Sequence, residues 1–156
     1  MPVTRSQRPS LPVEFPLGKG AGDGGIVLSD PVVKLIGRSP VYVCGETSLP
    51  DVARAMSEES IGTVLVSGAD GPSGIVSERD IVGALESGAD VRSLCARDVM
   101  SPDIAYAELT DTIGDTARRM LERAIRHIVV ARGDVPIGVV SMRDILAIYS
   151  DGGAAS

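Results

Sequence analysis

Two short phrases of the sequence each place a hydroxyl, a guanidinium and a carboxylate within one helical turn. The groups are Ser77, Arg79 and Asp80 in GIVSERDIV, and Ser141, Arg143 and Asp144 in GVVSMRDIL. An arginine can hold a phosphate through two parallel hydrogen bonds. A carboxylate can accept hydrogen bonds from the two hydroxyls of a ribose. Each phrase therefore carries the groups of a ribose-phosphate binding site.

The same spacing also describes an ordinary helix start. A serine at the N-cap and an aspartate three residues later satisfy backbone N–H groups that the helix leaves open, and a carboxylate suits the positive end of the helix dipole. Those open N–H groups also favour phosphate. A cap does not need an arginine between the two residues, so Arg79 and Arg143 favour binding over capping alone.

The two phrases belong to a longer internal repeat. Residues 46–85 align with residues 110–149 at an offset of 64 without a gap, and 15 of the 40 pairs are identical. Upstream, the repeat continues with a slip, so that LIGRSPVYV from Leu35 faces DVMSPDIAY from Asp98. A duplication of this kind predicts two similar units packed together.

Each copy predicts the element order β-α-β-β-α. A short helix leads to a strand at 41–44 or 104–107, and Ser48 or Thr112 then caps a helix, with an aspartate three residues later. Apolar residues at helical spacing predict the buried face of that helix, namely Leu49, Val52, Ala53 and Met56 in the first copy and Ile113, Thr116, Ala117 and Met120 in the second. Apolar runs separated by turn residues predict hairpins of strands at 63–66 and 74–77, and at 127–130 and 138–141. The second helix of each copy begins at Ser-x-x-Asp and runs to about Ser87 or Tyr149.

The two ends of the chain lack this pattern. Residues 1–30 are rich in proline and glycine and predict a flexible arm, and residues 151–156 predict a disordered tail. GAGDGG, from Gly20 to Gly25, matches the letters of a dinucleotide-binding turn, but a proline-rich segment precedes it where that turn needs a strand. We interpret this match as accidental.

Composition excludes several classes of function. The net charge is −6 and no run of lysine or arginine occurs, which argues against nucleic-acid binding. No stretch has the length of a signal peptide core or a membrane span, so we expect a cytoplasmic protein without membrane contact. Lys19 and Lys34 are the only lysines, and this arginine bias is typical of a bacterial protein from a GC-rich genome.

The chemistry-bearing residues outside the two phrases are few. Cys44 and Cys95 are the only cysteines, and we expect two buried thiols rather than a redox pair. With a single histidine and no metal-ligand spacing, nucleophile elbow or P-loop, the chain lacks the usual catalytic constellations. The sequence therefore predicts a protein that is not an enzyme and that holds no metal and requires no cofactor.

The tandem phrase, its spacing and the element order resemble a pair of cystathionine β-synthase (CBS) domains, also called a Bateman module. The resemblance covers residues 32–150. It implies an α+β fold with two β-α-β-β-α repeats, at 31–90 and 91–150, related by pseudo-twofold symmetry, each with a small sheet flanked by helices. In this family the aspartate usually holds the ribose of an adenosyl ligand, the serine or threonine lies near the phosphate, and the adenine rests against the first and second strands.

Carried onto this chain, the resemblance implies two nucleotide-binding sites. The first combines Ser77, Arg79 and Asp80 with Val43, Cys44, Ile61, Gly62 and Thr63. Its twin combines Ser141, Arg143 and Asp144 with Ile104, Ala105, Ile125, Arg126 and His127. The second site is better equipped for phosphate, because Arg126 and His127 replace Gly62 and Thr63, and Met142 replaces Glu78. A partly covered histidine with no ligand role remains an equal alternative for His127.

These observations predict a regulatory module without catalytic activity. An adenosyl ligand, with AMP, ADP, ATP and S-adenosylmethionine as candidates, would enter the cleft between the repeats and change their relative angle for an unknown regulated protein. The alternative is a ligand-free scaffold in which the phrases are only helix caps and apolar helix faces form a homodimer. The family resemblance implies a homodimer in either case. A redox switch that uses Cys44 and Cys95 is a more distant alternative.

Overall fold

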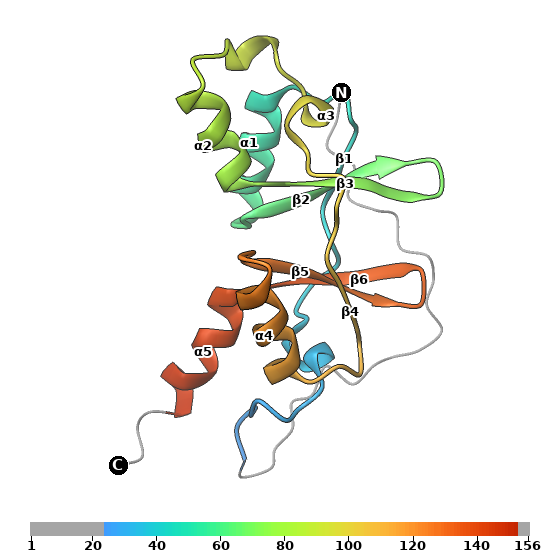
Figure 1. Cartoon of the computed structure of the whole chain (residues 1–156), viewed down its shortest axis with the longest axis vertical. Helices are drawn as coiled ribbons and strands as arrows, with labels where there is room; N and C mark the ends of the chain where they lie inside the picture. Colours follow the sequence, from blue (N-terminus) through green and yellow to red (C-terminus); the bar gives the residue numbers. More distant parts are fainter. Residues whose placement is uncertain (1–23, 153–156) are drawn as a thin grey trace. The chain divides into compact units, whose positions relative to one another are not determined.

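A computed structural model describes residues 24–152 of the chain. These residues form two compact units, and each is described by itself (Figure 1). The first unit comprises residues 40–104, and the second comprises residues 24–39 together with 105–152. The predicted flexible arm lies outside the described residues up to position 23, as do most of the GAGDGG motif and the last four residues of the predicted tail.

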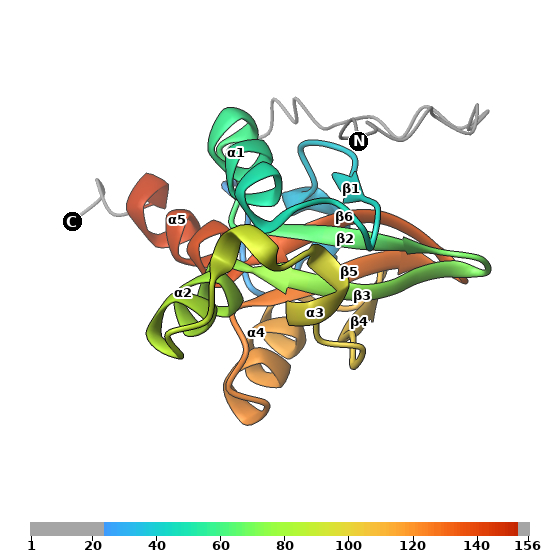
Figure 2. The same cartoon turned by 90° about the horizontal axis from the view of Figure 1, so that it is seen from above.

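The first unit is built on a three-stranded sheet with the strand order β1-β2-β3. Strands β1 and β2 are parallel, and β2 and β3 form an antiparallel hairpin. The elements are β1 (Tyr42–Val43), α1 (Leu49–Glu59), β2 (Thr63–Gly68), β3 (Gly71–Ser77), α2 (Glu78–Glu86), the 3-10 helix η2 (Val91–Ser93) and α3 (Ala96–Val99). Figure 2 shows that α1 and α2 lie at one end of the β2–β3 hairpin and that its turn lies at the other end.

The second unit repeats this plan. Its sheet has the order β4-β5-β6, with a parallel pair followed by an antiparallel hairpin. The elements are the 3-10 helix η1 (Val32–Leu35), β4 (Tyr106–Glu108), α4 (Ile113–Glu122), β5 (His127–Arg132), β6 (Val135–Ser141) and α5 (Met142–Gly152). The α+β class and the two β-α-β-β-α repeats are therefore confirmed.

The predicted buried helix faces are correct at most positions. Leu49, Val52 and Met56 are buried on α1, and the side chain that joins them is Ala55, whereas Ala53 is only half-buried. On α4 the predicted face is buried apart from Ala117, which is half-buried against the core. Each unit encloses its own apolar core between its sheet and these helices.

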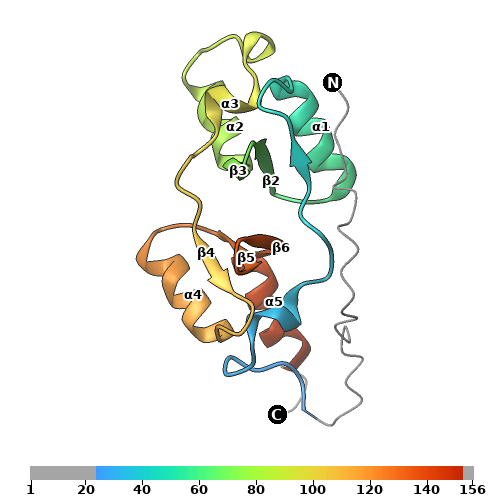
Figure 3. The same ribbon diagram turned by 90° about the vertical axis from the view of Figure 1, so that its right-hand side faces the viewer.

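Each unit takes one segment from a part of the chain that lies outside its own repeat. Residues 28–36, here the upstream clasp, pack on the second unit, and Val32 is fully buried in that unit's core. Residues 94–101, here the linker clasp, pack on the first unit, and Ala96 is fully buried there. Figure 3 shows the blue segment of the upstream clasp beside α5 of the second unit. Each clasp therefore packs on a different unit from the repeat that follows it along the chain.

The upstream clasp closes the start of α4 through backbone hydrogen bonds. The N–H groups of Ile113 and Gly114 donate to the carbonyls of Asp30 (2.9 Å) and Leu28 (2.8 Å). In the first unit, the N–H of Leu49 donates in the same way to the carbonyl of Leu94 (2.9 Å). These contacts occupy N–H groups that the helix cannot satisfy itself.

An ion pair stiffens the upstream clasp itself. Lys34 Nζ donates to Asp30 at 2.8 Å, and the N–H of Val27 donates to the same carboxylate at 2.9 Å. The hydrogen bond from Lys34, followed by that from Val27, lowers the pKa of Asp30 below its ordinary value. The clasp is therefore fastened by the charged form of Asp30.

The predicted slip of the repeat is wrong. Tyr42 lies opposite Leu65 in the first sheet, and Tyr106 lies opposite Val129 in the second, so the offset of 64 continues through the first strands. The quoted phrases pair Leu35 with Asp98, an offset of 63 that the strand pairing does not support. Residues of the two repeats correspond when they hold the same place in the strand pairing, because that pairing fixes the backbone hydrogen bonds.

None of the helices within residues 24–152 is long and apolar enough to cross a membrane.

Candidate functional site

The first candidate site lies where β3 ends and α2 begins. Ser77 is the N-cap of α2 and Asp80 is the third helical residue, as predicted. The N–H and the hydroxyl of Ser77 both donate to Oδ2 of Asp80, at 2.7 Å and 3.0 Å. One oxygen of the carboxylate therefore holds the helix start, and a ligand would have to use the other oxygen.

The second candidate site has the same position at the start of α5, and its cap is reciprocal. The N–H of Ser141 donates to Oδ2 of Asp144 at 2.8 Å, and the N–H of Asp144 donates to Oγ of Ser141 at 3.1 Å. Both copies thus pair the N-cap serine with the aspartate at the third helical position. The capping interpretation is correct at both sites, and it leaves a ligand role open.

Strand pairing brings four of the predicted residues beside these helix starts. Thr63 lies opposite Ser77, and the N–H of Glu78 donates to the carbonyl of Gly62 at 3.0 Å. His127 lies opposite Ser141 in the same register, and the N–H of Met142 donates to the carbonyl of Arg126 at 2.8 Å.

The predicted pair Val43 and Cys44 does not join the first site. Val43 lies opposite Val66, three residues beyond Thr63, which corresponds to about 10 Å along a strand. Val43 is 1% exposed, so its side chain belongs to the core. The sequence interpretation placed this pair three residues too far along the chain.

The corresponding pair in the second unit does lie at the correct end of its sheet. The carbonyl of Ala105 accepts from the N–H of Val129 at 3.0 Å, two residues from His127 along β5, and Ile104 precedes it. At the constant offset of 64 the counterpart of Ile104 is Pro40, which the sequence interpretation missed. The ungapped offset, extended upstream, was the signal that would have identified it.

The basic side chains at the two sites differ. Arg79 and Arg143 occupy the second helical position and are exposed, and Arg126, also exposed, lies just before β5 and accepts through its carbonyl from the N–H of Met142. Within residues 24–152 the guanidinium groups of Arg126 and Arg143 form no ion pair with an acidic side chain. Both groups can therefore receive an anion without first breaking an ion pair in this part of the chain.

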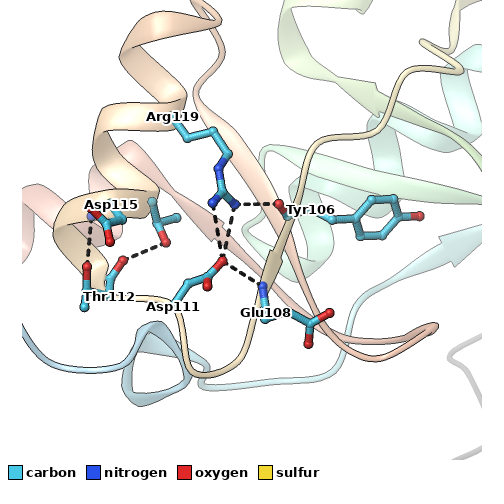
Figure 4. A network of polar contacts seen from close by, with 7 residues as sticks. Tyr106, Glu108, Asp111, Thr112, Asp115 and Arg119 are labelled. Carbon is cyan, nitrogen blue, oxygen red and sulfur yellow. Dashed lines mark hydrogen bonds and ion pairs between the residues drawn. The ribbon is translucent and has the colours of Figure 1, made fainter.

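A polar network in the second unit has a structural role (Figure 4). Asp111 accepts a hydrogen bond from the N–H of Glu108 at 3.0 Å, and Arg119 donates to Asp111 at 3.4 Å and to the carbonyl of Tyr106 at 2.7 Å. In the first unit, Thr47 closes the equivalent turn alone. The network joins α4 to β4, and the charges of Arg119 and Asp111 are paired with each other.

The expectation of two buried thiols is wrong for Cys44, which is exposed, whereas Cys95 is half-buried. Cys95 caps α3, where its N–H and its thiol donate to Asp98 at 2.8 Å and 3.2 Å. These hydrogen bonds, the N–H first, lower the pKa of Asp98. The part of the chain that the structure describes contains no group of three or more His, Cys, Asp or Glu residues that could hold a metal ion.

Comparison with known proteins gives consistent results. The CBS domain family model matches residues 32–87 and 96–151. An uncharacterized protein of Methanopyrus kandleri is 33% identical over 101 residues, which cover 63% of this chain and 52% of that protein. The chain spans about half the length of the curated relatives it matches.

Solved structures share the fold. The crystal structure of a CBS-domain-containing protein from Agrobacterium tumefaciens has a TM-score of 0.72 and 26% identity, and the match covers 78% of this chain and 94% of that one. A CBS domain protein from Pyrobaculum aerophilum, solved in complex with AMP, has a TM-score of 0.67 and 27% identity, with coverage of 80% and 99%. With both repeats matched by the family model, this chain belongs to the CBS domain family.

Proposed function

We propose that this protein is a non-catalytic regulatory module that binds an adenine nucleotide or another adenosyl ligand at the starts of α2 and α5. The ligand phosphate would contact Arg79 or Arg143, and the free carboxylate oxygen of Asp80 or Asp144 would accept from the ribose hydroxyls. The adenine would rest against the strand ends at residues 62–63 or 126–127.

The observation that carries the proposal is the repeated junction itself. In both units a strand end and a helix start bring a hydroxyl, an arginine and an aspartate together, and the aspartate uses one oxygen for the cap. The similarity to the AMP-bound protein of Pyrobaculum aerophilum supports an adenosyl ligand.

Regulation requires more than binding. A ligand shifts a conformational equilibrium only if it has different affinities for the two states. We propose that the ligand contacts both repeats, so that its binding changes their relative arrangement and a partner protein recognises the change.

Isothermal titration of AMP, ADP, ATP and S-adenosylmethionine into the protein tests this proposal. We expect saturable binding by at least one of these ligands, and we expect Asp80→Ala or Asp144→Ala to weaken it tenfold or more, on the order of 1.4 kcal/mol, because the ribose loses a charged acceptor. The variant that removes binding identifies the working site.

Asp98→Ala is the matched control for these variants. Asp98 makes the same N-cap hydrogen bond at the start of α3, at 2.8 Å, but lies outside the candidate sites. Asp98→Ala should therefore lower stability without weakening ligand binding. If none of the four ligands binds, and all three variants only lower the melting temperature, the repeated phrases are helix caps.

A second candidate function, a homodimeric scaffold, is favoured by a repeated apolar surface. Val82 and Leu85 are exposed on α2, and their counterparts Leu146 and Tyr149 are exposed on α5, at 57–61%. Because a twofold interface uses the same patch on both copies, a second copy of this chain is the occupant that this surface fits.

Sedimentation velocity at several protein concentrations tests the scaffold. We expect a dimer that Leu85→Asp and Tyr149→Asp shift to monomer by tenfold or more in dissociation constant, because each places a charge in an apolar contact. Leu121→Asp is the control, since Leu121 is 73% exposed on α4 and its counterpart in the first repeat is Ser57. A monomeric wild-type protein, or equal loss in the control, would contradict this candidate.

A further inference from the structure

The two candidate sites differ in charge although their backbones correspond. At the first junction one guanidinium, that of Arg79, accompanies the carboxylates of Glu78 and Asp80. At the second, the guanidiniums of Arg126 and Arg143 accompany the single carboxylate of Asp144. The duplication therefore produced one junction with an excess of negative charge and one with an excess of positive charge.

The positions that changed are the ones that the fold brings together. The N–H of residue 78 or 142, at the start of the helix, donates to the carbonyl of residue 62 or 126. This hydrogen bond joins Glu78 to Gly62 in the first unit, at 3.0 Å, and Met142 to Arg126 in the second, at 2.8 Å. His127, opposite Ser141, adds another possible donor at the same strand end.

We infer, on the basis of the proposed function, that the second site selects polyphosphate ligands and that the first does not. A nucleoside triphosphate carries about two more negative charges than a monophosphate. The second site offers two guanidiniums for these charges, and guanidiniums form strong charge-assisted hydrogen bonds with phosphate. At the first site Glu78 repels each added phosphate, so a nucleoside monophosphate or an uncharged adenosyl group is the better ligand there.

Titrations of AMP and ATP into the Asp80→Ala protein, in buffer without divalent cations, read the second site alone. We expect ATP to bind roughly tenfold more tightly than AMP, since one or two additional charge-assisted hydrogen bonds form. Met142→Glu gives the second site the carboxylate that Glu78 provides at the first site, and it should remove most of this preference for ATP. Met142 packs partly against the core, so Met142→Gln, of similar length but without charge, is the control and should keep the preference.

The converse experiment reads the first site in the Asp144→Ala protein. There AMP should bind at least as well as ATP, and Glu78→Gln should improve ATP binding severalfold. Equal affinity for AMP and ATP at the second site, or a preference that survives Arg126→Gln and Arg143→Gln, would overturn the inference while nucleotide binding stands.

Inorganic tripolyphosphate separates the failure of this inference from the failure of the proposed function. If tripolyphosphate binds and Arg126→Gln with Arg143→Gln abolishes its binding, but no adenosyl ligand binds, the polyphosphate site stands and the adenosyl function fails. If tripolyphosphate does not bind and nucleotides bind without preference, the inference is wrong and the proposed function stands. If neither class binds, both are wrong.

Discussion

Replacing Val32 with aspartate is expected to unfold the second unit and to leave the first unit folded. Val32 precedes the first repeat in sequence, yet it is fully buried in the core that β4, β5, β6 and α4 enclose. A carboxylate at this position would be buried without a partner, which costs more than about 3 kcal/mol. Hydrogen exchange should therefore show loss of protection in β5 and β6 and retained protection in β2 and β3.

The linker clasp provides the matched variant. Ala96 is the counterpart of Val32 at the offset of 64, and it is fully buried in the core of the first unit. Ala96→Asp should remove protection from β2 and β3 and spare β5 and β6. Loss of protection in β2 and β3 from Val32→Asp, or in β5 and β6 from Ala96→Asp, would contradict the exchanged arrangement.

The secondary structure of each repeat could be predicted because its signals are local. The apolar runs at 63–66 and 74–77, separated by turn residues, became the hairpin of β2 and β3. The repeated Ser-x-x-Asp marked the starts of α2 and α5, since capping depends only on side chains within one turn.

The exchange of the clasps could not be predicted because it depends on which unit a short segment packs against. The interpretation assigned each short helix to the strand that follows it, and the chain is continuous through residues 37–41 in either arrangement. No local signal in LSD, residues 28–30, states that the carbonyls of Leu28 and Asp30 will accept from the start of α4. The exposure of Cys44 escaped prediction for a related reason, since it depends on the turn that Thr47 closes after β1.

The candidate site was predicted best where it follows the hairpin and worst where it depends on the parallel strand. Ser77 and Thr63 meet through antiparallel register, which the turn length largely sets. The place of β1 beside β2 requires a long connection through α1, so no short turn sets its register. At the offset of 64 the counterparts of Ile104 and Ala105 are Pro40 and Val41, so the predicted pair Val43 and Cys44 lies three residues too far along the chain.

Gly74 and Gly138 occupy the same position in the two repeats, and we expect each to be required for its clasp to pack closely. A Cβ added at Gly138 would lie 2.6 Å from two carbons of Ile36, and one added at Gly74 would lie 2.6 Å from the sulfur of Met100. Gly138→Ala should destabilise the second unit by about 1–3 kcal/mol, because the crowded Ile36 side chain must move with the clasp backbone. Urea unfolding, with hydrogen exchange to assign the loss to one unit, measures the effect.

The crowding at Gly138 makes a specific claim about pairs of substitutions. Ile36→Ala removes the carbons that a new Cβ at position 138 would meet, at a cost of about 2 kcal/mol for a half-buried isoleucine. The double variant should then lose about 1 kcal/mol less stability than the sum of the two single losses. Without the Ile36 side chain, the new Cβ at position 138 meets no steric conflict. Gly83→Ala is the control: nothing lies within 4 Å of its added Cβ, and alanine in the interior of α2 should stabilise by about 0.5–1 kcal/mol. Additive effects of Ile36→Ala and Gly138→Ala would mean that the two positions do not touch in solution, and the upstream clasp would then have to lie elsewhere.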